Sequence, residues 1–257
     1  MPPKRYPWRV FWALFAAAIV GAASILPYVF EVFAAKLATD VEATSTLLVV
    51  LMQLLHLTLI FGIATGVGLL VAPKAGICLP FIEPRLYGQA SKLPADSFRV
   101  AGIAGLIVGT LSVSALYLII LPRIPEFPTE AAIPLWKRIG VCLYGGINEE
   151  LLMRLFFLSL ILWPLQKMSR RAPGQSAALF WIANVLVALL FGAAYLPATS
   201  SIVPLTAFSI TAIVLLKGAS GIVFGYLAWS RGLEAAIVAH FVSDLLIHIV
   251  GPFFSVQ

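Results

Sequence analysis

Three charged side chains, Glu149, Glu150 and Arg154, lie close together in the middle of a long apolar stretch. Lys137 lies twelve residues before Glu149 and Lys167 thirteen after Arg154, so a helix rising about 1.5 Å per residue spans roughly 45 Å between these lysines. That length is about the thickness of a bilayer with its headgroups, which places the three charges near the bilayer centre. Charged groups are costly there and are candidates for function by default.

The three charges are not equivalent, because they point in different directions. Glu150 and Arg154 are four residues apart on one helical face, so we expect them to form an ion pair. Glu149 points about 100° away around the helix and has no partner in its own segment. A carboxylate in a cavity that water can reach is what general-base catalysis requires, so Glu149 is the candidate base.

A second polar group lies on the last apolar stretch, where His240, Asp244 and His248 follow one another at spacings of four on one slowly drifting face. The depth of the first two can be estimated. Counted from Arg231 at about 1.5 Å per residue, they lie about 14 Å and 20 Å deep, and Glu149 lies about 18 Å from Lys137. If both basic residues mark the same membrane side, the two helices carry their ionisable groups at one depth. We expect a shared wet pocket; the alternative is a buried polar network that only holds the helices together.

The composition determines the fold class that must position these groups. Hydrophobic residues make up 61% of the 257 residues, charged residues only 11%, and the mean hydropathy is +1.02. These values predict an all-α, polytopic membrane helical bundle that forms a single integral membrane domain over residues 1–257. The net charge of +6 comes from scattered basic residues that form no stripe, so we expect no nucleic-acid partner. The two cysteines indicate neither a disulfide framework nor a thiolate metal site.

The apolar stretches predict about eight transmembrane helices, the first of them retained as a helix. Residues 73–96, rich in proline and glycine, predict a re-entrant or surface-lying segment. The sixth and seventh spans are separated at Gly218 to Gly221, and seven spans are the alternative if this break is absent. The expected spans are 8–34, 47–72, 98–121, the stretch through 149–154, 177–196, 202–216, 222–230 and 233–250.

The basic residues predict how the chain is oriented. With eight spans, eleven of them fall on the side of the N-terminus and five on the other side, so the positive-inside rule places both termini in the cytoplasm. The residues on the N-terminal side are Lys4, Arg5, Arg9, Lys74, Arg85, Lys92, Arg99, Lys167, Arg170, Arg171 and Lys217.

Two motifs together resemble a known family. The sequence Glu149-Glu150-Leu-Leu-Met-Arg154 and the sequence AHFVSD, in which His240 is followed by Asp244, are similar to the first and last motifs of the CPBP family of intramembrane endopeptidases. This family includes the CAAX prenyl proteases and bacteriocin-processing or immunity proteins. The resemblance covers about residues 135–250, which we interpret as the CPBP-type core.

The resemblance implies an intramembrane endopeptidase acting on a peptide or membrane-protein substrate in the lipid bilayer, in a bacterial-type inner (plasma) membrane. Glu149 would activate water, and Glu150 and Arg154 would pair and set the helix geometry. His240 would bind a catalytic metal or donate a hydrogen bond to the oxyanion, assisted by Asp244. The metal would be Zn²⁺, held by Glu149 and His240; a site without any cofactor is the alternative, and both stay open.

One position departs from the family pattern. Between the two motifs the family carries a phenylalanine followed four residues later by histidine, and this chain has Phe191 followed by Tyr195. Tyrosine can hold a water or an oxyanion but is a poor zinc ligand. His248 would have to reach about 12 Å along its helix from His240 to replace the missing histidine, and the contribution of His56 depends on packing.

This departure leaves two other functions to consider. The first is a catalytically impaired family member that acts as a membrane scaffold or as an immunity or partner-binding protein. The second is a transporter or channel, which the lack of an internal repeat and of paired interrupted helices disfavours.

Overall fold

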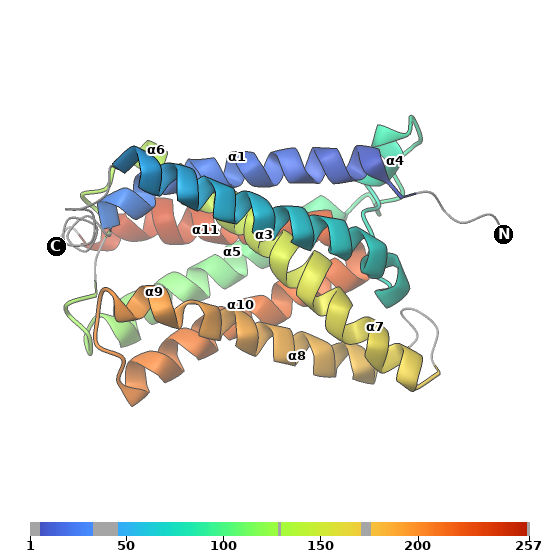
Figure 1. Cartoon of the computed structure of the whole chain (residues 1–257). Helices are drawn as coiled ribbons and strands as arrows, with labels where there is room; N and C mark the ends of the chain where they lie inside the picture. Colours follow the sequence, from blue (N-terminus) through green and yellow to red (C-terminus); the bar gives the residue numbers. More distant parts are fainter. Residues whose placement is uncertain (1–5, 33–45, 128–129, 171–175, 256–257) are drawn as a thin grey trace.

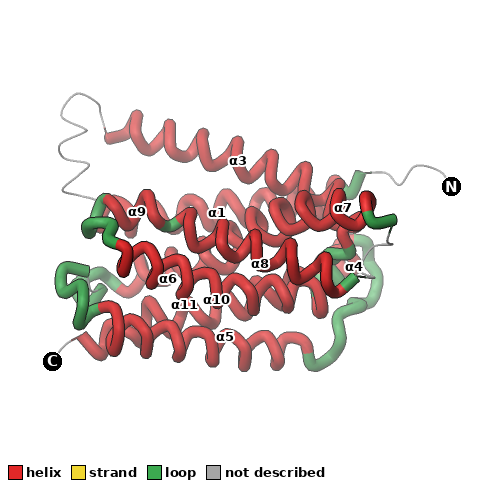
Figure 2. The backbone as a smooth tube through the Cα atoms, turned by 90° about the horizontal axis from the view of Figure 1, so that it is seen from below, coloured by secondary structure: helices red, strands yellow, loops and turns green. Residues whose placement is uncertain are grey.

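The computed structural model describes residues 6–32, 46–127, 130–170 and 176–255, and every regular element within them is a helix. Seven of the described helices are long and apolar enough to cross a membrane. They run back and forth, and their connections gather at the two ends of the bundle (Figures 1 and 2). The predicted all-α, polytopic membrane bundle is confirmed, and the protein is an integral membrane protein.

The described helices range from one short turn to thirty residues. In chain order they are α1 (Trp8–Val32), α3 (Thr46–Ala75), α4 (Ile82–Leu86), α5 (Ser97–Ala115), η1 (Leu116–Ile120), α6 (Leu135–Tyr144), η2 (Gly145–Glu149), η3 (Leu151–Leu158), α7 (Ser159–Met168), α8 (Ala177–Ala194), α9 (Leu196–Ser200), α10 (Ala207–Arg231), α11 (Leu233–Asp244), η4 (Leu245–Val250) and η5 (Gly251–Ser255). The closest neighbours include α10 with α8, α11 with α5, α1 with α6, and α3 with η3.

The expected break at Gly218 to Gly221 does not occur, because α10 is one continuous helix. A Cβ on Gly221 would lie 3.2 Å from Ala188 Cα, and one on Gly225 would lie 1.8 Å from Asn184 Oδ1. The glycines of this stretch therefore allow α10 to pack closely on α8, as small residues do in membrane bundles. The predicted sixth and seventh spans are one helix, so the count is seven within the described residues.

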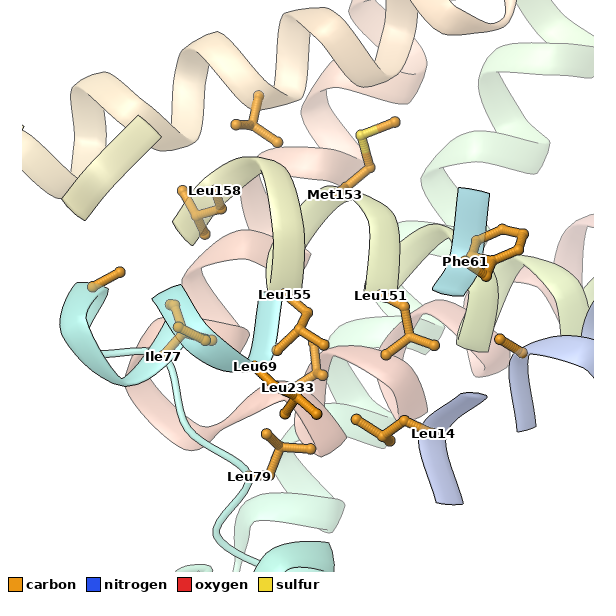
Figure 3. Close-up of a cluster of buried hydrophobic side chains, with 14 of the residues drawn as sticks. Leu14, Phe61, Leu69, Ile77, Leu79, Leu151, Met153, Leu155, Leu158 and Leu233 are labelled. Carbon is orange, nitrogen blue, oxygen red and sulfur yellow. The ribbon is translucent and has the colours of Figure 1, made fainter. Parts of the chain in front are cut away.

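The helix that carries the charged motif changes its winding at that motif. Its outer parts, α6 and α7, are α-helical, whereas η2 and η3 are π-helical turns. Such wider turns are rare and are frequent at functional sites. One side of η3 belongs to the apolar core, where Leu151, Leu155 and Leu158 are fully buried near Leu69 of α3 and Leu233 of α11 (Figure 3). This packing leaves the charged side of the same turns to face α8, α10 and α11.

The segment between α3 and α5 lies at the surface of one end of the bundle, where it contains the short helix α4 (Figure 1). Its backbone is tied to the start of α11. The buried carboxylate of Glu234 accepts hydrogen bonds from the backbone N–H groups of Phe81 (3.1 Å) and Ile82 (2.9 Å). Of the two forms expected for residues 73–96, the structure has the surface-lying one.

The start of α1 and the end of α11 lie at opposite ends of the bundle (Figure 1). Seven crossings place the two ends of a chain on opposite sides of a membrane, so the predicted cytoplasmic position of both termini requires an even number of spans. Four of the basic residues in sequence, Lys4, Arg5, Lys36 and Arg171, lie outside the described residues.

Candidate active site

Two adjacent glycines bring the charged motif against α11. A Cβ on Gly145 would lie 2.0 Å from Asp244 Oδ2 and 3.3 Å from His240 Nε2, and one on Gly146 would lie 2.9 Å from Phe241 Cβ. Contacts this short cannot accommodate a side chain at either glycine. The two residues before the acidic motif therefore allow η2 and α11 to approach closely, and they bring the two sequence motifs together.

The expected ion pair between Glu150 and Arg154 is present and fully buried. Arg154 Nε lies 3.3 Å from Glu150 Oε2, and the two side chains are 1% and 0% exposed. Arg154 Nη2 also donates a hydrogen bond of 2.9 Å to the Gly221 carbonyl of α10. The pair thus connects the helix of the acidic motif to α10.

Glu150 also contacts the histidine of the last helix. Its Oε1 atom lies 2.8 Å from His240 Nδ1, and the His240 side chain is buried. The carboxylate of Glu150, paired with Arg154, can only accept hydrogen bonds, so Nδ1 of the imidazole is the donor. This contact fixes the ring and leaves Nε2 directed toward the other carboxylates of the site.

Glu149 contacts side chains from two other helices, α8 and α11. The Tyr195 hydroxyl, at the end of α8, donates a hydrogen bond of 2.7 Å to Glu149 Oε1. The other oxygen, Oε2, lies 3.6 Å from His240 Nε2 and has no hydrogen-bond partner among the described residues. One oxygen of this carboxylate is therefore held by tyrosine, and the other faces the imidazole.

Asp244 completes the group around the imidazole. Its Oδ2 atom also lies 3.6 Å from His240 Nε2, which is too long for a direct hydrogen bond. The structure thus brings all six side chains predicted from the sequence into one connected group. These are Glu149, Glu150, Arg154, Tyr195, His240 and Asp244.

Two phenylalanines, which the sequence did not single out as packing partners of the site, enclose the group. The His240 ring stacks on Phe224 at 4.5 Å between centroids, and Phe191 meets it edge-on at 5.9 Å. The Arg154 guanidinium lies over the same two rings, at 5.3 Å from Phe191 and 5.9 Å from Phe224. These rings shield the buried charges from lipid and hold the guanidinium and the imidazole in place.

The part of the chain that carries these side chains is similar to a known protein family. Residues 131–246 match the family model described as Rce1-like, type II CAAX prenyl endopeptidase Rce1-like, and the match contains all six side chains of the group. Over these residues the chain is similar to the CPBP family, to which the two sequence motifs also pointed. No curated protein and no solved structure gives a significant match.

A cavity of about 250 Å³ adjoins the CPBP motifs. Tyr195, His240 and Asp244 line it, while Glu149 lies directly behind the first two of these side chains. Most of the remaining wall is apolar and includes residues of η1 and α10. Three of the six side chains therefore border a space inside the bundle that a substrate segment or water could enter, and Glu149 is connected to that space through its contacts with Tyr195 and His240.

A second polar cluster lines the same cavity away from the CPBP motifs. His248 Nδ1 lies 2.9 Å from both carboxylate oxygens of Glu130, and the Tyr28 hydroxyl donates a hydrogen bond to Glu130. Burial alone would raise the pKa of the Glu130 carboxyl, but the charge and hydrogen bonds of His248 and Tyr28 lower it below its usual value. His248 is thus engaged with Glu130 and not with His240. No sequence pattern predicts this contact, since Glu130 lies in a loop.

The donor set of this CPBP site does not fit a catalytic zinc ion. Such sites use three protein ligands, commonly with two or more histidines. Within the described residues no group of three or more His, Cys, Asp or Glu side chains is arranged to hold a metal ion. His240 is the one histidine near Glu149 in this part of the chain, since His248 binds Glu130 and His56 is exposed on α3.

Proposed function

We propose that this protein is an intramembrane endopeptidase that cleaves a peptide or membrane-protein substrate, with Glu149 activating water beside His240. The observation that carries the proposal is the pair of facing atoms, Glu149 Oε2 and His240 Nε2, beside a cavity within a membrane bundle. The family match supports the same reaction class, because its description names a CAAX prenyl endopeptidase.

The first step of the proposed mechanism is proton transfer from water to Glu149. Oε2 is free to accept this proton, since Tyr195 occupies Oε1. A water between Oε2 and the His240 imidazole would lie within hydrogen-bonding reach of both groups. The hydroxide that forms attacks the carbonyl carbon of the scissile peptide bond, and the carbonyl oxygen becomes an oxyanion.

The second step is collapse of the tetrahedral intermediate. Hydrogen-bond donors near a developing oxyanion lower the barrier, and the candidate donors on the cavity wall are the Tyr195 hydroxyl and, in the protonated imidazolium form, Nε2–H of His240. The carbon–nitrogen bond breaks, and Glu149 returns its proton to the leaving amine. Glu150 holds the His240 ring through Nδ1 in both steps, so it acts as a positioning residue.

The substrate must present an extended segment, because a backbone carbonyl in a helix is already hydrogen-bonded and shielded from water. The apolar side chains that line most of the cavity favour apolar side chains in that segment. A bacterial-type inner membrane stays a prediction for the location of the reaction.

The direct test is proteolysis by the purified protein in liposomes, with a panel of peptides carrying apolar residues. We expect the wild type to cleave at least one of them and Glu149→Ala to cleave none. Zinc chelators should leave the rate unchanged, because the proposed steps use no metal. Cleavage by Glu149→Ala at the wild-type rate would remove the mechanism, and loss of activity with a chelator would restore the zinc alternative.

A non-catalytic scaffold or immunity role predicts a different result. The reason to consider this role is the tyrosine at position 195, where the resemblance implies a histidine. Tyr195 still provides a polar group at this position, because its hydroxyl donates a hydrogen bond to Glu149. If no peptide is cleaved while a partner protein still binds the wild type and Glu149→Ala equally, this second role replaces the first.

A further inference from the structure

Lys217 introduces a positive charge into the middle of an apolar helix. It lies on α10 ten residues after Ala207, which is about 15 Å along the helix axis. Its side chain lines the cavity, and its Nζ atom lies over the ring of Tyr195, 4.1 Å from the centroid. The tyrosine that replaces the family's histidine is therefore in direct contact with a cation.

This cation has no carboxylate partner among the residues that the structure describes. Of the acids at this cavity, Glu130 binds His248, Glu149 accepts the hydrogen bond from Tyr195, and Asp244 faces His240 Nε2 at 3.6 Å. A lysine inside a membrane is costly and is normally paired or functional. The Lys217 ammonium group therefore lies against the face of the Tyr195 ring.

We propose that Lys217 is a positioning residue for the hydrolysis, acting through Tyr195. This inference rests on the proposed function. The ammonium group holds the ring in place and draws electron density from it, so the phenolic O–H becomes a stronger hydrogen-bond donor. During the reaction negative charge moves from Glu149 to the oxyanion. The Tyr195 hydroxyl can then donate its hydrogen bond to the oxyanion instead of to Glu149. The Lys217–Tyr195 pair thereby supplies the electrostatic stabilisation that a protonated histidine would give at this position.

The experiment is a double-substitution cycle on peptide cleavage in liposomes. Lys217→Met should lower kcat by roughly tenfold to thirtyfold, with KM within about twofold, since a desolvated cation–π contact has that strength. Lys217→Arg should retain most of the activity, because a guanidinium keeps the charge over the ring. In the Tyr195→Phe background the ring remains but the hydroxyl is absent, so Lys217→Met should change kcat by less than about threefold.

A matched control is Lys167→Met, which removes a lysine lying over the Trp163 ring at 5.7 Å, away from the cavity. This variant should cleave at the wild-type rate, and thermal unfolding in detergent should confirm that every variant folds. The inference is overturned if Lys217→Met keeps the wild-type kcat, or if its effect is as large with phenylalanine at position 195 as with tyrosine. In either case an active wild type leaves the proposed function standing. A wild type that cleaves no peptide overturns both.

Discussion

Glu149 and Glu150 are neighbours in sequence but have opposite environments. Glu150 is 0% exposed, with one oxygen 2.8 Å from His240 Nδ1 and the other 3.3 Å from Arg154 Nε, whereas Glu149 is 15% exposed and its Oε2 has neither an arginine nor a hydrogen-bond partner among the described residues. A carboxylate with both oxygens engaged holds structure, and one with a free oxygen can take a proton. The two glutamates have different roles because they lie on different faces of the same helix.

The buried pair leads to a prediction about stability. Arg154→Leu leaves the Glu150 carboxylate uncompensated in the interior, so we expect a loss of about 3 to 5 kcal/mol in the free energy of unfolding. Chemical or thermal unfolding in detergent micelles measures it. A double variant with leucine at both positions should lose less, because no charge is then left unpaired. An Arg154→Leu protein as stable as the wild type would show that the pair does not hold the bundle.

Some of these contacts could be predicted from sequence and others could not. The spacing of four residues was enough to predict the pair between Glu150 and Arg154, because both lie on one helix. The hydrogen bond from Tyr195 to Glu149 joins residues 46 positions apart, and it depends on how α8 packs against the helix of the acidic motif, which it contacts at η3. No local pattern carries that information.

At the scale of elements, the site depends on how closely η2 and α11 approach. Gly145→Ala should therefore push the two helices apart, lower activity by at least roughly tenfold and reduce stability, since a 1 Å misplacement of catalytic groups costs about 10²-fold. Gly102→Ala on α5 is the matched control, because a Cβ there would meet no atom within 4 Å. Peptide cleavage and thermal unfolding measure both effects. Equal behaviour of the two variants would contradict the role of the close approach.

The predicted contact between the acidic motif and the last helix is present, but Lys137 and Arg231 were wrongly placed on the same membrane side. Lys137 and Arg231 do not mark the same side, since Lys137 pairs with Glu31 at the end of α1 and Arg231 with Asp96 at the start of α5. These positions are at opposite ends of the bundle once α10 is a single helix (Figure 1). The motifs still meet, because each lies near the middle of its own helix.

For the whole molecule, seven crossings change the expected topology. By sequence position, eleven basic residues then lie at the end where α1 begins and four at the other end, so the positive-inside rule predicts a cytoplasmic N-terminus and a C-terminus outside. The four are Lys36, Arg123, Lys137 and Arg138. A green fluorescent protein fused to the C-terminus should stay dark in bacterial cells, and an alkaline phosphatase fusion should be active. The reverse pattern would indicate an even number of spans.

The fold class was predictable because hydropathy over twenty residues is a strong signal, whereas the number of spans was not. Glycines either end a helix or allow two helices to pack closely, and the stretch from Gly218 to Gly221 reads the same in both cases. Only the position of α8 shows that these glycines are packing residues.

The central claim is that Glu149 is the base that activates water, and the rate of peptide hydrolysis by Glu149→Gln tests it most directly. Glutamine keeps the size of the side chain and can still accept the hydrogen bond from Tyr195, but it cannot take a proton from water. With unfolding temperatures matched to the wild type, and with Glu31→Gln at the end of α1 as a control that cleaves normally, we predict a fall in kcat of at least about 10²-fold. A folded Glu149→Gln protein that hydrolyses the peptide at the wild-type rate would contradict the account.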